Sequence, residues 1–381
     1  MNILVIGNGF DLAHGLPTSY KDFLEFTDNY MSYAKSINDN LLSELKTLVS
    51  NNCWLEYFKR TYIGNGWIDF EKEMSNVIMM IDQKKDKFVR IGEPGFAFVK
   101  LSDKERKILM YFDSRSANGI IDNKDFLFMI KERMLNDLNR LIRCLEIYLD
   151  CYINHSSVKE LSPDIADLNI DKVLSFNYTN TYARIYDNSK NNNIEYDYIH
   201  GKADIEPEHD MKTNDMVLGI DEYLPDDRKN KDLDFIAFKK FYQRIYKQTG
   251  CKYKEWVGEI IKGADYDKLD ALKYRLEYEE NIKKGLDGYA HTAKQKLMEL
   301  KEQRVKHNLY IFGHSLDVTD KDILKELILN DNVHTTIFYH NKEVKAQQIA
   351  NLVKVIGQDE LIRRSGEKTI EFTPQQKMNN I

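Results

Sequence analysis

The sequence predicts an α/β protein with a doubly wound, mostly parallel sheet and large helical insertions. Six short apolar segments, typical of buried parallel strands, are separated by segments with helical periodicity. Each apolar segment ends in a glycine or polar cluster, such as residues 7–9 (Gly-Asn-Gly) and 313–315 (Gly-His-Ser). Because ligands gather at the carboxyl ends of parallel strands, we expect these clusters to meet at one edge of the sheet.

Length and composition set the broad class of the protein. The chain has 381 residues, enough for one large domain or two ordinary ones, and 42% of them are hydrophobic, so a substantial core can form. The formal net charge of −6 gives no general attraction to nucleic acid. A dedicated nucleic-acid-binding protein is therefore disfavoured, although a local basic groove remains compatible with the composition.

The cysteines and the apolar segments indicate the cellular compartment. Cys53, Cys144, Cys151 and Cys251 form no Cys-x-x-Cys pair, which argues against a zinc ribbon and favours free thiols in a reducing cytosol. No basic leader precedes the apolar segment that starts at Ile3, so we expect no signal peptide, and no apolar run is long enough to span a membrane. The sequence therefore predicts a cytoplasmic protein.

The chain leaves the predicted sheet twice, which divides it into a discontinuous core and two insertions. We assign residues 1–17, 168–225 and 307–381 to the core. Residues 18–167 have helical periodicity and little strand signal, and residues 226–306 are rich in charge with the same period. We expect both of these stretches to be helical insertions.

The elements follow in order along the chain. The predicted strands and their polar ends lie within residues 3–6, 171–180, 194–201, 216–221, 308–317 and 334–340. The first insertion begins with Thr18 or Ser19 as a helix cap and includes a long helix over residues 126–152. Residues 319–322 (Thr-Asp-Lys-Asp) resemble a capping box at the start of a helix. After the last predicted helix, the tail from Ser365 is polar.

The first predicted strand runs into Gly7 and Gly9, which permit a sharp turn and a close approach of the backbone to a ligand. The N–H groups of such a loop at the start of a helix suit a pyrophosphate, so we expect a nucleotide site here, on a Rossmann-like sheet. The usual dinucleotide motif has a third glycine where this chain has Leu12, and the next glycine is Gly15. A tight strand-to-helix turn without a ligand is the alternative explanation.

Asn177 and His200 stand at the ends of predicted strands and are the candidates for catalysis. An imidazole can act as an acid or a base near neutral pH, and Gly201 beside it would admit a ligand. The Asn177 amide could orient a water or a ribose hydroxyl. The alternatives are a structural histidine with satisfied hydrogen bonds and an asparagine that forms a turn.

Other polar residues have two explanations each. Asp11 and Asp317 could cap helices or bind ribose hydroxyls. Glu71 is interpreted as a surface residue at the start of a helix and is kept as a candidate site residue. Residues 239–247 carry a basic helix face interleaved with tyrosines, which is either a solvated face or a surface that reaches phosphate.

Four sequence blocks resemble the AbiH family of bacterial abortive-infection proteins. They are residues 7–23 (GNGFDLAHGLPTSYKDF), 175–179 (SFNYT), 200–201 (HG) and 312–317 (FGHSLD), and they cover most of the chain in the order of the family. The first and last blocks are specific, whereas the helical insertions are not. The resemblance implies a role in defence against bacteriophage.

The same blocks are similar to the wider sirtuin-like group, which implies a sirtuin-like sheet and hydrolysis of NAD. Sirtuins have a glycine six positions after their second loop glycine, as Gly15 follows Gly9 here. They also carry an asparagine, a His-Gly pair and a later Gly-Thr-Ser. On this resemblance, Asn177 and His200 take the positions that act on the bond between nicotinamide and ribose.

The chain departs from the sirtuin pattern at several positions. Asp11 stands where sirtuins have a serine, Thr179 stands where they have an acid, and an expected arginine near Tyr20 is missing. The sequence also has no four-cysteine zinc module. These departures argue against protein deacetylation, but the asparagine and the histidine remain.

We therefore expect an antiphage abortive-infection effector that hydrolyses the N-glycosidic bond of NAD, or of a related nucleotide, without a metal. Asn177 and His200 are the expected catalytic residues. The expected nucleotide-binding residues are Gly7, Asn8, Gly9, Phe10, Asp11, Gly15, Tyr178, Gly201, Gly313, His314, Ser315 and Asp317. The alternatives are a non-catalytic nucleotide-binding sensor or scaffold and, ranked last, a nuclease or nucleic-acid-binding toxin.

The expected partners follow from the same reasoning. The ligand is NAD or an ADP-ribose-like nucleotide, and the resemblance allows a phage-derived activator or a partner defence protein. Self-association into a homo-oligomer is compatible with the sequence. We expect neither a membrane nor a nucleic acid as partner, because the chain is acidic and has no carboxylate cluster with metal-binding spacing.

Overall fold

The structure is a computed structural model that describes residues 1–33, 37–65, 69–187, 193–205, 211, 213–303 and 306–380. Within these residues, six strands form one parallel sheet in the order β6-β5-β1-β7-β8-β9. The strands are β1 (Asn2–Ile6), β5 (Lys172–Ser175), β6 (Glu195–Tyr198), β7 (His307–Phe312), β8 (Val333–Tyr339) and β9 (Ile370–Pro374). The predicted α/β class and the parallel sheet are confirmed.

The prediction of a sheet strand over residues 216–221 is wrong. Residues 216–221 form no strand of the sheet, and only Ile220 makes an isolated bridge, to Lys239. Met216, Leu218 and Ile220 are instead buried in the core of the first insertion, so their apolar character reflects contact with helices. The sixth strand is β9, which pairs with β8 and lies in the tail that was predicted only as polar.

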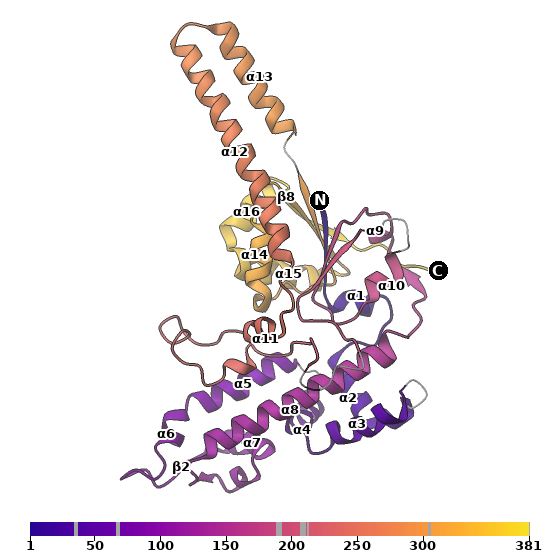
Figure 1. Cartoon of the computed structure of the whole chain (residues 1–381), viewed down its shortest axis with the longest axis vertical. Coiled ribbons are helices and arrows are strands. Elements are labelled where there is room, and N and C mark those ends of the chain that lie inside the picture. Colours follow the sequence, from indigo (N-terminus) through magenta and orange to yellow (C-terminus); the bar gives the residue numbers. More distant parts are fainter. Residues whose placement is uncertain are drawn as a thin grey trace.

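Helices cover both faces of the sheet, which gives three layers (Figure 1). Along β1, Ile3 and Val5 point to one face, while Leu4 and Ile6 point to the other. The first face packs against α12 (Tyr253–Lys283), α14 (Lys321–Ile328), α15 (Lys342–Ile356) and α16 (Gln358–Gly366). The second face packs against α1 (Asn8–Ala13), α9 (Pro163–Ala166) and α10 (Thr181–Tyr186).

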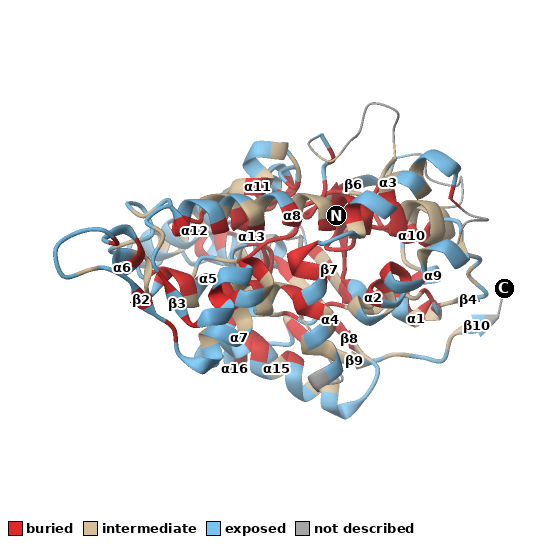
Figure 2. Ribbon diagram, turned by 90° about the horizontal axis from the view of Figure 1, so that it is seen from below, coloured by how far each residue is buried: buried red, intermediate tan, exposed pale blue. Residues whose placement is uncertain are grey.

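The first insertion is a helical body with its own core, whose buried residues appear red in Figure 2. Ser19 caps its first helix and forms a capping box with Asp22, as predicted for one of the two candidate caps. The helices are α2 (Tyr20–Asn29), α3 (Asp39–Val49), α4 (Cys53–Asn65), α5 (Phe70–Asp82), α6 (Lys85–Val89), α7 (Asp103–Phe112) and α8 (Phe126–Tyr148), which continues as a π-helix, η3 (Leu149–Ile153). Short strand pairs are β2 (Val99–Lys100) with β3 (Ile120–Ile121), and β4 (Glu160–Leu161) with β10 (Asn379–Asn380).

The second insertion contains a short helix, α11 (Lys240–Lys247), and a hairpin of α12 (Tyr253–Lys283) and α13 (Asp287–Gln303). Trp256 and Ile260 pack the first part of α12 on the sheet. The rest of the hairpin projects from the body of the protein (Figure 1). Among the described residues, no helix has the length and apolar character needed to cross a membrane.

The strand order reverses between β1 and β7, where an open parallel sheet usually leaves a ligand crevice. Here the loops after these strands contact each other directly. The N–H of Gly9 donates to the Gly313 carbonyl at 2.8 Å, and the N–H of Gly7 donates to the Phe312 carbonyl at 3.3 Å. A Cβ atom at Gly9 would lie 2.8 Å from the Gly313 oxygen, so close packing of the two loops already explains this glycine.

Replacing Gly313 by alanine should destabilise the fold more than the same change at Gly15. Both residues have positive φ, +67° and +74°, but a Cβ at Gly313 would lie 2.1 Å from the Phe10 nitrogen, whereas one at Gly15 would meet nothing within 4 Å. We expect losses in the free energy of unfolding of about 3 kcal/mol or more for Gly313→Ala and about 1 kcal/mol for Gly15→Ala. Urea denaturation measures both, and equal losses would contradict the close loop contact.

Candidate functional site

Asn177 lies in the loop after β5 and is held against the loop after β1. Its Nδ2 donates to the Gly7 carbonyl at 3.0 Å, and its backbone N–H donates to Ser175 Oγ at 3.1 Å. The side-chain Oδ1 is buried and has no hydrogen-bond partner within the described part of the chain. A buried amide oxygen in this state is available to accept a hydrogen bond from a ligand.

His200 follows β6 and lies beside the same loop. Its ring contacts the rings of Phe176 and Tyr178, with centroid separations of 5.7 and 6.2 Å. The His200 Nε2 is 3.8 Å from Asp320 Oδ1, and its Nδ1 is buried with no hydrogen-bond partner in the described residues. The two predicted catalytic residues therefore lie in one region, because Asn177 stands between Phe176 and Tyr178 in the chain.

Asp320 connects His200 with a second histidine, His314. The His314 Nδ1 accepts a hydrogen bond from the Leu316 N–H at 2.9 Å, so the ring proton is on Nε2, which faces Asp320 Oδ2 at 3.3 Å. Burial alone would raise the pKa of Asp320, but the hydrogen bond from His314 and the charge of Lys240 hold it well below its usual value. Asp320 is therefore an ionised carboxylate that faces both imidazoles.

Asp320 was not among the predicted site residues, because residues 319–322 were interpreted as a capping box in which Thr319 and Asp322, not Asp320, are the pairing residues. The structure does not form that box: Asp317 accepts a hydrogen bond from the Thr319 N–H at 3.2 Å, and Asp320 at the start of α14 makes no side-chain cap. The Asp320 carboxylate is bonded to His314 instead. The spacing of the predicted box gives Asp320 no role, so no sequence signal indicated its contact with His314.

A buried lysine from the second insertion completes this group of residues. Lys240 is 5% exposed, and its Nζ is 2.6 Å from Glu71 Oε2. Burial would lower the pKa of Lys240, but the charges of Glu71, Asp320 and Asp221 outweigh it and raise the pKa above its usual value. Burial raises the pKa of Glu71 to about 7 and that of Asp221 to about 6, although Lys240 favours both carboxylates in their ionised form.

Lys240 and His200 are buried, whereas Glu71, Asp221 and Asp320 are partly buried around them. We call these five residues the buried charge cluster. Glu71, interpreted from the sequence as a surface residue and kept as a site candidate, is a member. Burial lowers the pKa of His200 to about 3, with a further contribution from the Lys240 charge, so the ring is neutral near pH 7. In the described part of the chain, no three or more His, Cys, Asp or Glu residues are placed to hold a metal ion.

The basic face predicted over residues 239–247 does not face solvent. Lys239 Nζ is 2.8 Å from Glu222 Oε1, and Lys247 Nζ donates to Asn214 Oδ1 at 2.9 Å. Neither the solvated face nor the phosphate-reaching surface describes these lysines, and both interpretations are wrong for them. Helical spacing shows which residues share a face, but it does not show whether that face is turned inward.

The predicted nucleotide-binding residues at the sheet edge are mostly used in contacts within the protein. The N–H groups of Gly7 and Gly9 donate to the β7 loop, as described above, and Phe10 donates to the Gly7 carbonyl at 2.8 Å. Tyr178 donates its hydroxyl to the Val217 carbonyl at 2.8 Å. Gly201 has φ of +74° and lies against residue 215, whose carbonyl oxygen would be 2.0 Å from an added Cβ.

Four other predicted nucleotide-binding residues are not members of the buried charge cluster. The Phe10 side chain is fully buried in the core under the sheet. Asn8 is exposed and exchanges two hydrogen bonds with Thr18. Gly15 and Ser315 are exposed. Their positions give these residues structural or surface roles in this conformation.

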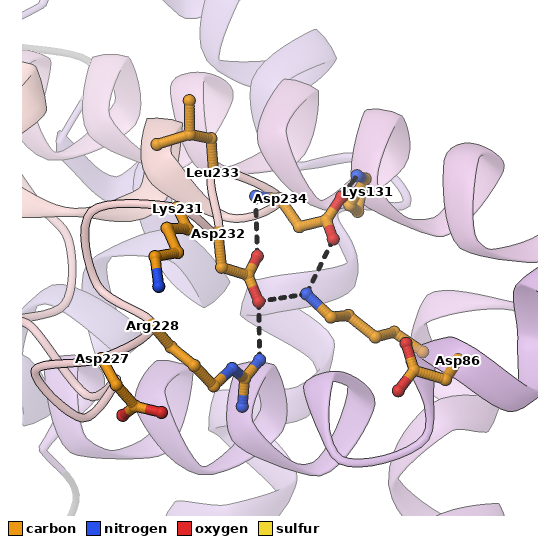
Figure 3. Close-up of a pocket in the computed structure, with 9 residues that line it drawn as sticks. Asp86, Lys131, Asp227, Arg228, Lys231, Asp232, Leu233 and Asp234 are labelled. Carbon is orange, nitrogen blue, oxygen red and sulfur yellow. Dashed lines mark hydrogen bonds and ion pairs between the residues drawn. The ribbon is translucent and has the colours of Figure 1, made fainter.

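A surface pocket of about 600 Å³ lies between the two insertions and includes none of the predicted site residues (Figure 3). Its charged side chains pair with one another. Lys85 binds Asp232 and also Asp234, the latter at 2.8 Å, and Arg228 Nη2 lies 2.6 Å from Asp232 Oδ2. The charges of Lys85, Arg228, Asp232 and Asp234 therefore have partners, and the pocket is best explained as an ionic contact that joins residues 226–234 to the first insertion.

Asp11 is a second buried carboxylate at the sheet edge. Thr179 Oγ1 donates to its Oδ2 at 2.6 Å, whereas its Oδ1 has no hydrogen-bond partner within the described residues. Burial raises the pKa of Asp11 to about 6, although the hydrogen bond from Thr179 acts in the opposite direction. The folded protein therefore holds a proton on Asp11 at pH values where the unfolded chain has released it.

This raised pKa predicts a pH-dependent difference between the wild type and Asp11→Asn. The stabilising effect of the extra proton is complete below about pH 4 and is lost as the pH rises through about 6. Relative to Asp11→Asn, the wild type should lose up to about 3 kcal/mol of unfolding free energy over this window. Urea denaturation between pH 4.5 and 7.5 measures the difference, and parallel curves would contradict the buried, protonated state.

Comparison with known proteins assigns the chain to a family. Among curated proteins, no sequence matches it. The model of the family described as bacteriophage abortive infection AbiH matches residues 3–340, which include both insertions, the buried charge cluster and the strands from β1 to β8. Because this match spans most of the chain, the protein belongs to the AbiH family of bacteriophage abortive-infection proteins.

Proposed function

We propose that this AbiH protein acts in defence against bacteriophage by hydrolysing the N-glycosidic bond of NAD or of a related nucleotide. Family membership supports the abortive-infection role. The hydrolysis is inferred from the chemistry of the sheet edge and from the sequence resemblance to sirtuin-like proteins. The observation that carries it is the His200 ring, whose Nε2 faces an ionised Asp320 while its Nδ1 has no hydrogen-bond partner among the described residues.

His200 and Asp320 suit the role of a general base with its orienting carboxylate. In the proposed reaction, a water oxygen attacks C1′ of the ribose and its proton passes to His200 Nδ1. The electrons of the broken C1′–N bond go to the nicotinamide ring, which becomes neutral. The Asp320 charge stabilises the imidazolium that forms, and general-base assistance of this kind contributes about 10² to 10⁴ in rate.

Asn177 supplies the second polar group of the proposed reaction. Its amide nitrogen is fixed by the Gly7 carbonyl, so its Oδ1 has a defined position at the same edge of the sheet as His200. An acceptor held in this way can orient a ribose hydroxyl or the attacking water through one hydrogen bond. The proposed reaction requires Asn177 and His200 to contact the same substrate molecule.

His200→Ala and Asn177→Ala should each lower nicotinamide release from NAD by at least about 10²-fold, because each removes a group needed in the transition state. The double variant should be only slightly slower than either single variant. His334→Ala is the matched control, since His334 is half-exposed on β8 and pairs with Glu371 at 3.1 Å. Rates are compared at a temperature at which melting curves show every variant to be folded.

The result that overturns the hydrolysis is folded wild-type protein that releases no nicotinamide, either alone or with lysate of phage-infected cells. Calorimetry with NAD and ADP-ribose would then test the sensor alternative, which predicts binding without product. One observation favours that alternative: Thr179, which replaces the sirtuin acid, donates its hydroxyl to Asp11 and supplies no carboxylate. The nuclease alternative has no support from the inward-facing lysines of residues 239–247.

A further inference from the structure

The short helix α11 has its polar and apolar faces reversed. Lys240 and Gln243 are buried, whereas Ile245 and Tyr246 are 70% and 73% exposed. An ordinary surface helix buries its apolar face and exposes its charges. The inward lysines of α11 therefore require an explanation in terms of what they contact.

Polar contacts hold α11 to the rest of the protein. Lys240 pairs with Glu71, and Gln243 Nε2 donates to the Leu218 carbonyl at 3.1 Å. Lys247 donates to Asn214 and to the Met216 carbonyl. In water such groups recover much of the same hydrogen bonding, so a helix held in this way can move outward at a lower cost than one held by apolar burial.

Lys240 places one positive charge among several negative ones. Its ammonium contacts Glu71 directly and interacts with the charges of Asp320 and Asp221. If Lys240 moved outward, these buried carboxylates would lose the cation that stabilises their ionised forms. The vacated position would therefore favour another cation of similar size.

We propose that Lys240 is a gate that occupies the position of the substrate's positively charged ring. The substrate class is a nucleotide with a cationic base, of which NAD with its pyridinium ring is the example, and neutral-base nucleotides are excluded. This assignment of the substrate rests on the proposed hydrolysis, whereas the gate itself rests on the contacts of Lys240. Outward movement of α11 opens the site, and the arriving ring replaces the ammonium.

The gate also explains how the closed protein keeps His200 inactive. The side chains of His200 and Asn177 are buried in this conformation, so a nucleotide cannot reach them unless part of the surrounding structure moves. The Lys240 charge further disfavours a proton on His200. Outward movement of Lys240 removes this opposing charge, so in the proposed gate it makes His200 a stronger base.

The test compares Lys240→Met with Lys239→Met. Lys239 is the neighbouring buried lysine, but it pairs with Glu222 outside the buried charge cluster. The probe is 1-methylnicotinamide, a pyridinium cation, with neutral nicotinamide as the comparison ligand, and affinities are measured by calorimetry. Lys240→Met should bind the cation at least tenfold more tightly than the wild type, Lys239→Met should not, and neutral nicotinamide should show no such gain.

The outcomes separate the gate from the proposed hydrolysis. A gain in cation binding without NAD turnover supports the gate and overturns the hydrolysis. Turnover by the wild type that Lys240→Met abolishes, without any gain in cation binding, overturns the gate and makes Lys240 a catalytic residue. Folded Lys240→Met with unchanged affinity for the cation also overturns the gate.

A second measurement uses the unmodified protein and does not depend on whether the variant folds. Saturating 1-methylnicotinamide should compete with the Lys240 ammonium and displace α11. Hydrogen exchange of the α11 amides should then accelerate several-fold, while exchange in α8 stays constant. Unchanged or slower exchange in α11 at saturating probe would overturn the gate.

Discussion

Burial of the Lys240 ammonium is the interaction on which the arrangement of the site depends. Removing a charged amine from water costs several kcal/mol, so it is stable in the interior only with opposite charges close by. Glu71 comes from α5 in the first insertion, and Asp320 comes from the segment after β7. The lysine itself comes from the second insertion. This one ammonium therefore ties both insertions to the carboxyl edge of the sheet.

The sheet contributes a second constraint at the same edge. The contact between Gly9 and Gly313 fills the position between β1 and β7 where a crevice is usual, and it brings the two loops together. The carbonyl of Gly7 then fixes Asn177, and the β7 loop carries His314 to Asp320. Gly9 and Gly313, which the sequence predicts to bind a nucleotide, are thus needed for backbone packing. Their presence alone does not distinguish a ligand-binding loop from a tightly packed one, because both need a residue without a side chain.

Local patterns predict much of this fold but less of the site. Strands β1, β5, β6, β7 and β8 follow from short apolar runs, and parallel pairing brings Asn177, His200 and His314 to one edge, as expected. Residues 216–221 have the same apolar pattern without joining the sheet, since helices rather than strands bury them. Lys240 was unpredictable for a related reason: periodicity defines a helix face, but only tertiary packing decides which face is inward. Asp320 carried no sequence signal of its own, because it lies inside residues 319–322, which were interpreted as a capping box formed by Thr319 and Asp322.

Departures from local rules gather at this edge of the sheet. Asp320 gives its carboxylate to His314 rather than to the start of α14, α11 turns Lys240 inward, and Asp11 is buried with a raised pKa. Each of these arrangements lowers local stability, and proteins retain such destabilising arrangements where a function requires them. Away from this edge the rules hold, as in the capping box of Ser19 with Asp22. In the pocket between the insertions, opposite charges simply pair on the surface. The concentration of these unfavourable arrangements around His200 is the physical reason why we propose a function for the sheet edge rather than for the pocket between the insertions.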